Sequence, residues 1–327
     1  MTVFEELKIR SCPVCFDSSE NASLFFEERL DTARLDSFSF ASRKTPEFMS
    51  YRLFRCAACR TVYAAAAPPP DALAVAYSNA AYDSAEEAIL AADTYEAVLQ
   101  PVIASLPQGA RALETGAGTG VFLERLRAAG VAEVVGVEPS KAAIEAADAK
   151  IRPFIHEGIF TEEEFAPESF DLICCFQTLE HVPAPKELTE SCLRLLRPGG
   201  VLAFVTHDYT APINRLLGRR SPIIDIKHLQ LFCRPSLDKL LASAGFVAEK
   251  IIPLANRYPL NYWLRLSPLP APIKRVTLRA LALLGFGALR IEINVGNLVA
   301  IGRNASPVEG RVDARGFRNG FRRGHAP

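Results

Sequence analysis

The chain has 327 residues, enough for one large domain or two modest ones with a substantial buried core. Its 37 Lys and Arg residues balance 37 Asp and Glu residues, so no overall charge favours nucleic acid or an anionic membrane. Residues 1–6 carry no signal-peptide pattern, and no apolar stretch is long enough to span a bilayer. We therefore expect a cytoplasmic protein with no nucleic-acid partner and at most peripheral membrane contact.

Four of the eight cysteines form two close pairs near the N-terminus, Cys12-Pro-Val-Cys15 and Cys56-Ala-Ala-Cys59. Each pair has the spacing of a zinc knuckle, which brings two thiolates to one tetrahedral ion. We predict a structural Zn²⁺ site in a module over residues 1–67; the alternative is four free thiols in a small apolar module. The other four are predicted to be buried as small apolar side chains: Cys174, Cys175, Cys192 and Cys233.

A composition break follows this module. Residues 64–70, with four alanines and three prolines, disfavour both a helix and a central strand and predict a linker. Residues 84–106 show helical spacing of apolar positions and end at Pro-Gln-Gly. We expect residues 68–109 to form a linker and a lid helix.

From residue 110 onward the pattern alternates between strand and helix. Strands are predicted at 111–114, 133–138, 153–156, 170–176, 201–206 and 246–252, with a last one near 293–301; helices are predicted at 121–129, 141–150, 186–196 and 235–244. This alternation is typical of a doubly wound α/β sheet with helices on both faces, here spanning residues 110–302.

Two segments depart from that alternation. Residues 253–290 are rich in Pro and Leu and predict an inserted helical cap, although the arginines and aromatics of 256–265 also suit a sugar, a lipid-linked acceptor or an oligomer contact. The Gly- and Arg-rich tail at 303–327 is expected to be disordered.

The central signal is the segment 112–122, which reads Ala-Leu-Glu-Thr-Gly-Ala-Gly-Thr-Gly-Val-Phe. Glycines let the backbone approach a ligand, and the following helix offers unpaired N–H groups. A dinucleotide fingerprint needs its third glycine where Val121 stands, whereas here it comes one residue early, at Gly120. Glu138 ends the next strand, where a carboxylate can accept hydrogen bonds from both hydroxyls of a ribose.

This stretch resembles the class I methyltransferases that use S-adenosylmethionine (SAM), whose first motif has the form acid-x-Gly-x-Gly-x-Gly. Further similarity lies in Ser-Phe-Asp-Leu-Ile at 169–173, Leu-Glu-His-Val at 179–182 and Leu-Arg-Pro-Gly-Gly at 196–200, and it covers about residues 75–302. The resemblance implies a Rossmann-like, seven-stranded, mostly parallel sheet. Many bacterial members begin with a similar zinc-ribbon-like cysteine module.

The resemblance also implies roles at the cofactor. Glu114 would hold the methionine amino group, Gly116, Gly118 and Gly120 would make room for the cofactor, and Glu138 would bind the ribose diol. Phe160 would pack on the adenine, since the acidic residue that many members carry there is missing. Glu180 is expected in the loop beside the cofactor, and Tyr77 and Tyr82 are expected in a lid segment.

Methyl transfer needs a base only when the acceptor loses a proton as it reacts. His181 and His207 follow predicted strands, His228 lies in Lys-His-Leu at 227–229, and histidine titrates near neutral pH. We predict that at least one of them is catalytic; the alternative is that they only orient loops or pack against the sheet.

The predicted activity is SAM-dependent O- or C-methylation of a small-molecule or sugar-type acceptor, including nucleotide- or lipid-linked ones. One alternative is an NAD-dependent reductase or epimerase, against which Val121 and the lack of a Tyr-x-x-x-Lys pair weigh. Another is a zinc-containing nucleic-acid-binding protein with a degenerate Rossmann domain, which the zero net charge disfavours.

Overall fold

The computed structural model describes residues 7–41, 48–267 and 269–305. The predicted disordered tail lies outside these residues, except for its first three positions. Among the described residues, no helix has the length and hydropathy to cross a membrane.

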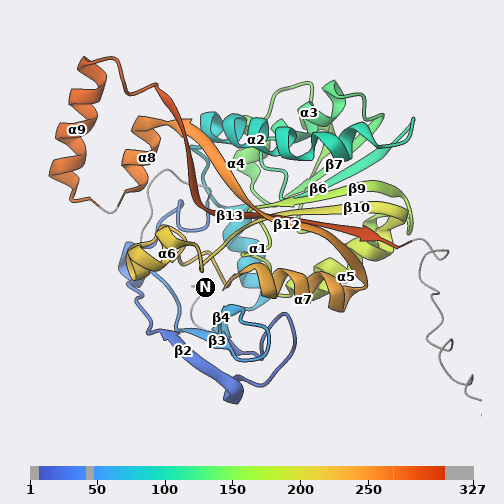
Figure 1. Ribbon diagram of the computed structural model, residues 1–327, viewed down its shortest axis with the longest axis horizontal. Helices are drawn as coiled ribbons and strands as arrows, with labels where there is room; N and C mark the ends of the chain where they lie inside the picture. Colours follow the sequence, from blue (N-terminus) through green and yellow to red (C-terminus); the bar gives the residue numbers. More distant parts are fainter. Residues whose placement is uncertain (1–6, 42–47, 268, 306–327) are drawn as a thin grey trace, which may run out of the picture.

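The centre of the molecule is a seven-stranded sheet with the order β12–β13–β10–β9–β6–β7–β8 (Figure 1). Only β13 runs opposite to the other six strands, so the sheet is mostly parallel. The strands are β6 (Arg111–Thr115), β7 (Glu133–Glu138), β8 (Ile155–Glu157), β9 (Phe170–Phe176), β10 (Leu196–His207), β12 (Phe246–Pro259) and β13 (Arg290–Asn304). This is the predicted doubly wound, Rossmann-like α/β fold.

Helices cover both faces of this sheet because its central strands are apolar on both sides. Leu172 and Cys174 of β9 pack with α2 and α3 on one face, whereas Ile173 and Cys175 pack with α5 and α7 on the other. The helices are α1 (Pro70–Ser78), α2 (Ala85–Ala104), α3 (Val121–Ala128), α4 (Lys141–Ala146), α5 (Pro185–Leu195), α6 (Pro212–Leu217), α7 (Arg234–Ala244), α8 (Leu260–Leu266) and α9 (Ala271–Leu283). The four cysteines outside the N-terminal pairs are free and buried, as predicted.

The N-terminal module packs against the part of the chain that forms the seven-stranded sheet. A four-stranded sheet has the order β11–β4–β3–β2, and a short pair joins β1 to β5. The strands are β1 (Lys8–Ile9), β2 (Ala22–Phe26), β3 (Leu53–Cys56), β4 (Val62–Ala64), β5 (Ala66–Ala67) and β11 (Gln230–Leu231). Since β11 comes from far along the chain, the two parts share one sheet.

Three predicted elements differ from the structure. The helix predicted at 141–150 ends at Ala146, because Ala147 is extended and the Asp148 side chain accepts a hydrogen bond from the Lys150 amide in a turn. The predicted linker 64–70 contains β5 and the first residue of α1, where proline is tolerated because its missing N–H has no helical partner.

The third difference concerns residues 253–290, predicted as a wholly helical cap. β12 continues through Pro253 to Pro259, and β13 begins at Arg290, so the two strands form a long pair that carries α8 and α9 at its tip. Proline fits within β12 because this strand lies at the edge of the sheet.

Candidate active site

A cavity of about 1190 Å³ opens at the carboxyl ends of β6, β7, β9 and β10. Parallel strands bring their carboxyl ends to one edge of a sheet, which explains why residues far apart in the sequence meet here. The predicted site residues that line the cavity are Tyr77, Tyr82, Glu114, Gly116, Gly118, Glu138, Phe160, His181, His207 and His228. Gly120 and Glu180 are not among the lining residues.

The glycine loop follows β6 in a conformation that side chains rarely adopt. Gly116 has φ +75°, and a Cβ there would lie 2.2 Å from Oγ1 of Thr178, so this position excludes any larger residue. Gly118 has φ +55° and open space where a Cβ would point. The loop therefore brings bare backbone to the cavity.

Gly120, for which a cofactor contact is predicted, does not line the cavity. A Cβ at Gly120 would lie 2.9 Å from the Ile155 side chain and 3.2 Å from Ile151. This glycine therefore allows α3 to begin close to β8, and it acts in packing.

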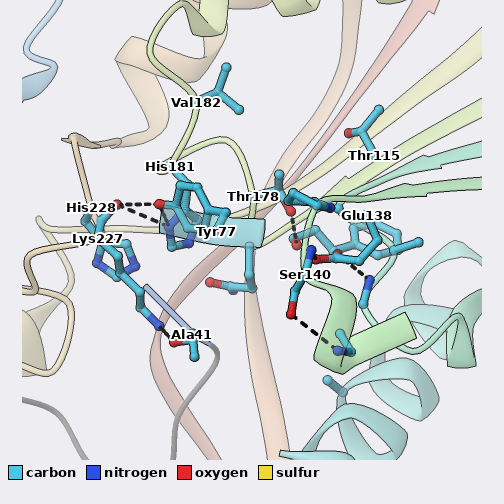
Figure 2. A pocket seen from close by; sticks show the side chains of 18 of the residues that line it. Ala41, Tyr77, Thr115, Glu138, Ser140, Thr178, His181, Val182, Lys227 and His228 are labelled. Carbon is cyan, nitrogen blue, oxygen red and sulfur yellow. Dashed lines mark hydrogen bonds between the residues drawn. The ribbon is translucent and has the colours of Figure 1, made fainter. Parts of the chain in front are cut away.

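Glu138 lies at the end of β7 and is buried. Its Oε2 accepts a hydrogen bond from the Gly118 amide at 2.8 Å, and its Oε1 accepts one from the Ser140 amide at 2.8 Å (Figure 2). Burial raises the pKa of Glu138, and the two amides lower it. A carboxylate has about four acceptor positions, so both oxygens can still accept a hydrogen bond from a diol.

Glu114, near the end of β6, is buried with one carboxyl oxygen, Oε2, that has no hydrogen-bond partner. Burial, and secondarily the charge of Glu138, raises the pKa of Glu114 well above its ordinary value. A buried oxygen without a partner is costly, and an ammonium group is the partner that satisfies it best. Together, Glu114, Glu138 and the open backbone at Gly118 fit the amino group, the ribose and the bulk of SAM.

The segment before α2 closes the cavity from the module side. Tyr77 of α1 and Tyr82 in the following loop both line the cavity. The Ser140 hydroxyl donates to the carbonyl of Ala80 at 3.1 Å, which ties this segment to the start of α4. Phe160, after β8, contributes an aromatic wall.

The three predicted histidines gather at one side of the cavity, with His181 and His228 from two loops and His207 from the end of β10 (Figure 2 shows His181 and His228). The ring of His228 lies 4.9 Å from that of His181 and 5.2 Å from that of His207, centroid to centroid. Tyr77 joins them, with its hydroxyl 3.1 Å from Nδ1 of His181.

An oxygen atom faces Nδ1 of each of these imidazoles. The partners are the Lys227 carbonyl for His181 (3.1 Å), the Asn297 amide oxygen for His207 (2.8 Å) and the Ile223 carbonyl for His228 (2.8 Å). A carbonyl can only accept, so these contacts favour the tautomer with the proton on Nδ1 and the lone pair on Nε2.

Burial keeps these histidines neutral. It lowers the pKa of His181 to about 3 and that of His207 to about 4, and it lowers the pKa of His228 as well; the nearby Lys227 ammonium adds to each effect. All three imidazoles are therefore unprotonated at neutral pH and keep a lone pair on one ring nitrogen.

Glu180 is fully buried behind this cluster. Its Oε1 accepts a hydrogen bond from the His207 amide at 2.6 Å, and its carbonyl accepts one from the Leu229 amide at 2.8 Å. Burial raises the pKa of Glu180 to about 7. Glu180, expected beside the cofactor, does not line the cavity; its hydrogen bonds connect the loop of His181 to the end of β10 and to the segment after His228.

The paired cysteines meet as predicted from their spacing. The Sγ atoms of Cys12, Cys15, Cys56 and Cys59 all lie within 4.8 Å of one another. Cys12 and Cys59 are 3.4 Å apart, and Cys15 and Cys56 are 3.5 Å apart, close to the ~3.8 Å that Zn–S bonds of about 2.3 Å give in a tetrahedron. The Cys12 contact lowers the pKa of Cys59 to about 5.

Sequence reasoning missed the residue that joins the cysteine module to the histidine loops. The Arg10 guanidinium donates to the carbonyls of Ala64 (2.8 Å), Pro183 (2.8 Å) and Leu229 (2.7 Å), and to Oε1 of Gln230 (3.1 Å). The Gln230 amide in turn donates to carbonyls on both sides of His181, those of Leu179 (2.7 Å) and Val182 (2.8 Å). No local pattern marks Arg10, because all of its partners lie at least 54 positions away.

Comparison with known proteins gives the site its family. A model of the methyltransferase domain matches residues 86–251, which is half of the chain. The ubiquinone biosynthesis O-methyltransferase of Alkalilimnicola ehrlichii is 37% identical over 177 residues, which cover 47% of this chain and 69% of that relative. The protein of the same name from Neisseria meningitidis is 32% identical over 105 residues, 30% of this chain, and the match spans less than half (44%) of that relative.

A solved SAM-dependent methyltransferase from Aquifex aeolicus aligns with a TM-score of 0.41 at 13% identity, over 64% of this chain and 89% of that one. The fold is defined by the strand order of the sheet. The family match over residues 86–251 and the mostly parallel seven-stranded sheet agree with each other. The chain belongs to the class I SAM-dependent methyltransferases.

Proposed function

We propose that this enzyme transfers the methyl group of SAM to a hydroxyl oxygen of a small, largely apolar molecule, and that His181 takes the proton. The observation that carries the proposal is the neutral histidine cluster in the wall of the same cavity that holds Glu114 and Glu138. The relatives named ubiquinone biosynthesis O-methyltransferases support oxygen as the accepting atom.

Six further aromatic side chains belong to the cavity wall. Tyr95, Phe122, Phe176, Tyr258, Tyr262 and Trp263 all line it. Such walls bind apolar or aromatic groups by burying their surface.

Three polar side chains beside these aromatics, Asn256, Tyr258 and Asn297, bond to one another. The Asn297 amide donates to Oδ1 of Asn256 at 2.8 Å, and the Asn256 amide donates to the Tyr258 hydroxyl at 3.0 Å. A sugar needs many hydrogen-bond partners, so an apolar acceptor fits better than the sugar-type acceptor expected from the sequence. Nucleotide- and lipid-linked sugars remain the competing substrates to assay.

When bound, SAM supplies an activated methyl group. The chain's residues then position the acceptor, exclude water and accept a proton. His181 is a weak base because burial lowers its pKa, but the acceptor O–H becomes strongly acidic as its oxygen gains the methyl group. The proton then passes to Nε2 of His181, while the contact with the Lys227 carbonyl holds the ring.

The experiment compares His181→Ala, His207→Ala and His228→Ala in a methyl-transfer assay against hydroxylated aromatic compounds and nucleotide-sugars. General-base catalysis contributes about 10²- to 10⁴-fold, so we expect kcat to fall at least 100-fold for His181→Ala with cofactor affinity unchanged. A kcat near the wild-type value for all three variants would refute a histidine base. Turnover of sugars alone would refute the apolar acceptor.

A further inference from the structure

Two helices, α8 and α9, connect the ends of β12 and β13 and extend beyond the seven-stranded sheet. We call residues 260–267 and 269–289 the α8–α9 arm. Figure 1 shows α9 projecting away from the body of the molecule, with α8 between it and the sheet. Apolar side chains on such a projecting element are unfavourable in water unless a binding partner covers them.

One face of α9 is an exposed apolar stripe. No residue of this 13-residue helix is buried. Ile273, Val276, Leu283 and Leu284 have the spacing i, i+3, i+10 and i+11, which puts them on one side, and Val276 and Leu283 are 67% and 88% exposed. Exposed apolar side chains grouped in this way mark an interaction surface.

The arm is also strongly basic, although the whole chain is neutral. Residues 260–289 contain four Lys and Arg residues and no Asp or Glu. Arg275 and Arg279 are exposed on α9, and Arg279 precedes Leu283 by one turn, so the positive charge borders the stripe. An apolar stripe flanked by arginines matches a helix that lies in the interface of an anionic membrane.

We propose that the α8–α9 arm docks the enzyme on anionic lipid bilayers. A second copy of the chain fits this surface less well, because a symmetric contact would place like charges against each other. Nucleic acid would leave the apolar stripe in water. A bilayer with anionic headgroups satisfies both the charge and the apolar side chains.

The arm is built into the wall of the active-site cavity. Tyr262, Trp263 and Leu266 of α8 line that cavity, and the Trp263 indole donates to the Ile291 carbonyl at 3.1 Å, which fixes α8 to β13. Docking through α9 therefore brings a wall of the cavity toward the lipid, where a membrane-dissolved apolar acceptor would be found. This last step rests on the proposed function; the docking itself does not.

The test is co-sedimentation of the full chain with vesicles of phosphatidylcholine, alone or with one third phosphatidylglycerol. We expect binding to the anionic vesicles that is at least tenfold tighter than to neutral ones and that weakens with added salt. The double variants Val276→Glu/Leu283→Glu and Arg275→Glu/Arg279→Glu should each lose at least tenfold in affinity.

Two matched controls use exposed residues elsewhere. Val247→Glu places a charge on an exposed apolar residue at the start of β12, and Lys150→Glu/Lys239→Glu changes the net charge by the same amount as the arginine pair. Both should bind like wild type, and thermal unfolding checks that every variant is folded. Equal binding to both vesicle types, unchanged binding of the arm variants, or dimerisation that the Val276→Glu/Leu283→Glu variant abolishes would overturn the proposal. Because no acceptor is needed, this failure is distinct from failure of the proposed methyl transfer.

Discussion

The two buried glutamates in the site differ in the hydrogen-bond partners of their carboxyl groups. Glu138 accepts hydrogen bonds from two backbone amides, whereas one oxygen of Glu114 has no partner. The raised pKa means that the Glu114 carboxyl keeps its proton at a higher pH than an exposed glutamate does. A bound ammonium group would instead stabilise the ionised form of the Glu114 carboxyl and lower its pKa.

We therefore expect cofactor binding to release a proton from Glu114. The ammonium group lowers the carboxyl pKa, so the site binds fewer protons when it is occupied, and affinity rises with pH through the raised pKa of the free protein. Calorimetry of S-adenosylhomocysteine binding in buffers of different ionisation enthalpy measures the released fraction, up to one proton.

Glu114→Gln is the matched control, because it keeps the shape and removes the charge. It should abolish the proton release and weaken binding by roughly ten- to hundredfold, the value of a charged hydrogen bond. Release that persists in Glu114→Gln would assign the proton to another group, such as Glu138.

At the same scale, sequence reasoning located the residues but not all of their contacts. The glycines, Glu114 and Glu138 follow from a local motif, and His181 and His207 follow from positions after predicted strands, whereas no predicted strand end marks His228. Their convergence on His228, and the partners that fix their tautomers, depend on contacts between loops far apart in the chain. Gly120 and Glu180 belong to motifs expected at the cofactor. In the fold, however, Gly120 packs against Ile151 and Ile155, and Glu180 accepts a hydrogen bond from the His207 amide.

At the scale of elements, Arg10 and Gln230 join β1, β4 and β11 to the loop that carries His181. We define these two residues as the Arg10–Gln230 clasp. The hydrogen bonds from Gln230 fix the carbonyls on both sides of His181, so the clasp determines where the imidazole lies in the cavity.

We expect Arg10→Met to lower kcat about tenfold while the affinity for S-adenosylhomocysteine stays within threefold, because the cofactor residues lie on other loops. The unpaired carbonyls should also cost about 1–3 kcal/mol each in the free energy of unfolding. Steady-state kinetics well below the unfolding temperature and calorimetry measure the two effects separately.

Arg10→Lys should recover part of the kcat, since an ammonium can donate to some of the same carbonyls. Arg52→Met, which removes an exposed ion pair with Glu27 in the same module, should change neither property. A lower unfolding temperature with unchanged kcat in Arg10→Met would make the clasp purely structural.

The elements themselves were predicted well where the periodicity is strong. The buried strands β6, β7 and β9 and the helices α3, α5 and α7 follow from their apolar spacing and glycine ends. Sequence reasoning does not predict β11, because a two-residue strand is too short to show a hydrophobic periodicity. It does not predict the extension of β12, because Pro253 is typical of the end of a strand. Both exist because a neighbouring strand supplies the hydrogen bonds, which is tertiary information.

At the scale of the whole molecule, the cysteine module and the methyltransferase sheet form one packed unit. β4 pairs with β11, and the core of the module includes Tyr209 and Ile226 from the second part of the chain. A metal ion at the four cysteines would thus stabilise the entire enzyme.

We expect metal analysis to find one Zn²⁺ per chain and chelation to lower the temperature of a single unfolding transition by about 10 °C. Metal binding contributes several kcal/mol to the free energy of unfolding, and each kcal/mol shifts the unfolding temperature by roughly 2–4 °C. Cys59→Ser should lose the metal, whereas Cys192→Ala, a buried cysteine outside the cluster, should keep it. A metal-free native protein, or a separate transition for the module, would contradict this account.

The central claim is that the glycine loop after β6 and the Glu138 carboxylate together bind SAM. The most direct measurement is isothermal titration calorimetry of the full chain with S-adenosylhomocysteine, with Glu138→Ala and NADH for comparison. We predict one binding site per chain, at least tenfold weaker binding in Glu138→Ala, since two hydrogen bonds to the ribose are lost, and no heat with NADH. Absence of binding to S-adenosylhomocysteine, or equal affinity in wild type and Glu138→Ala, would contradict the account.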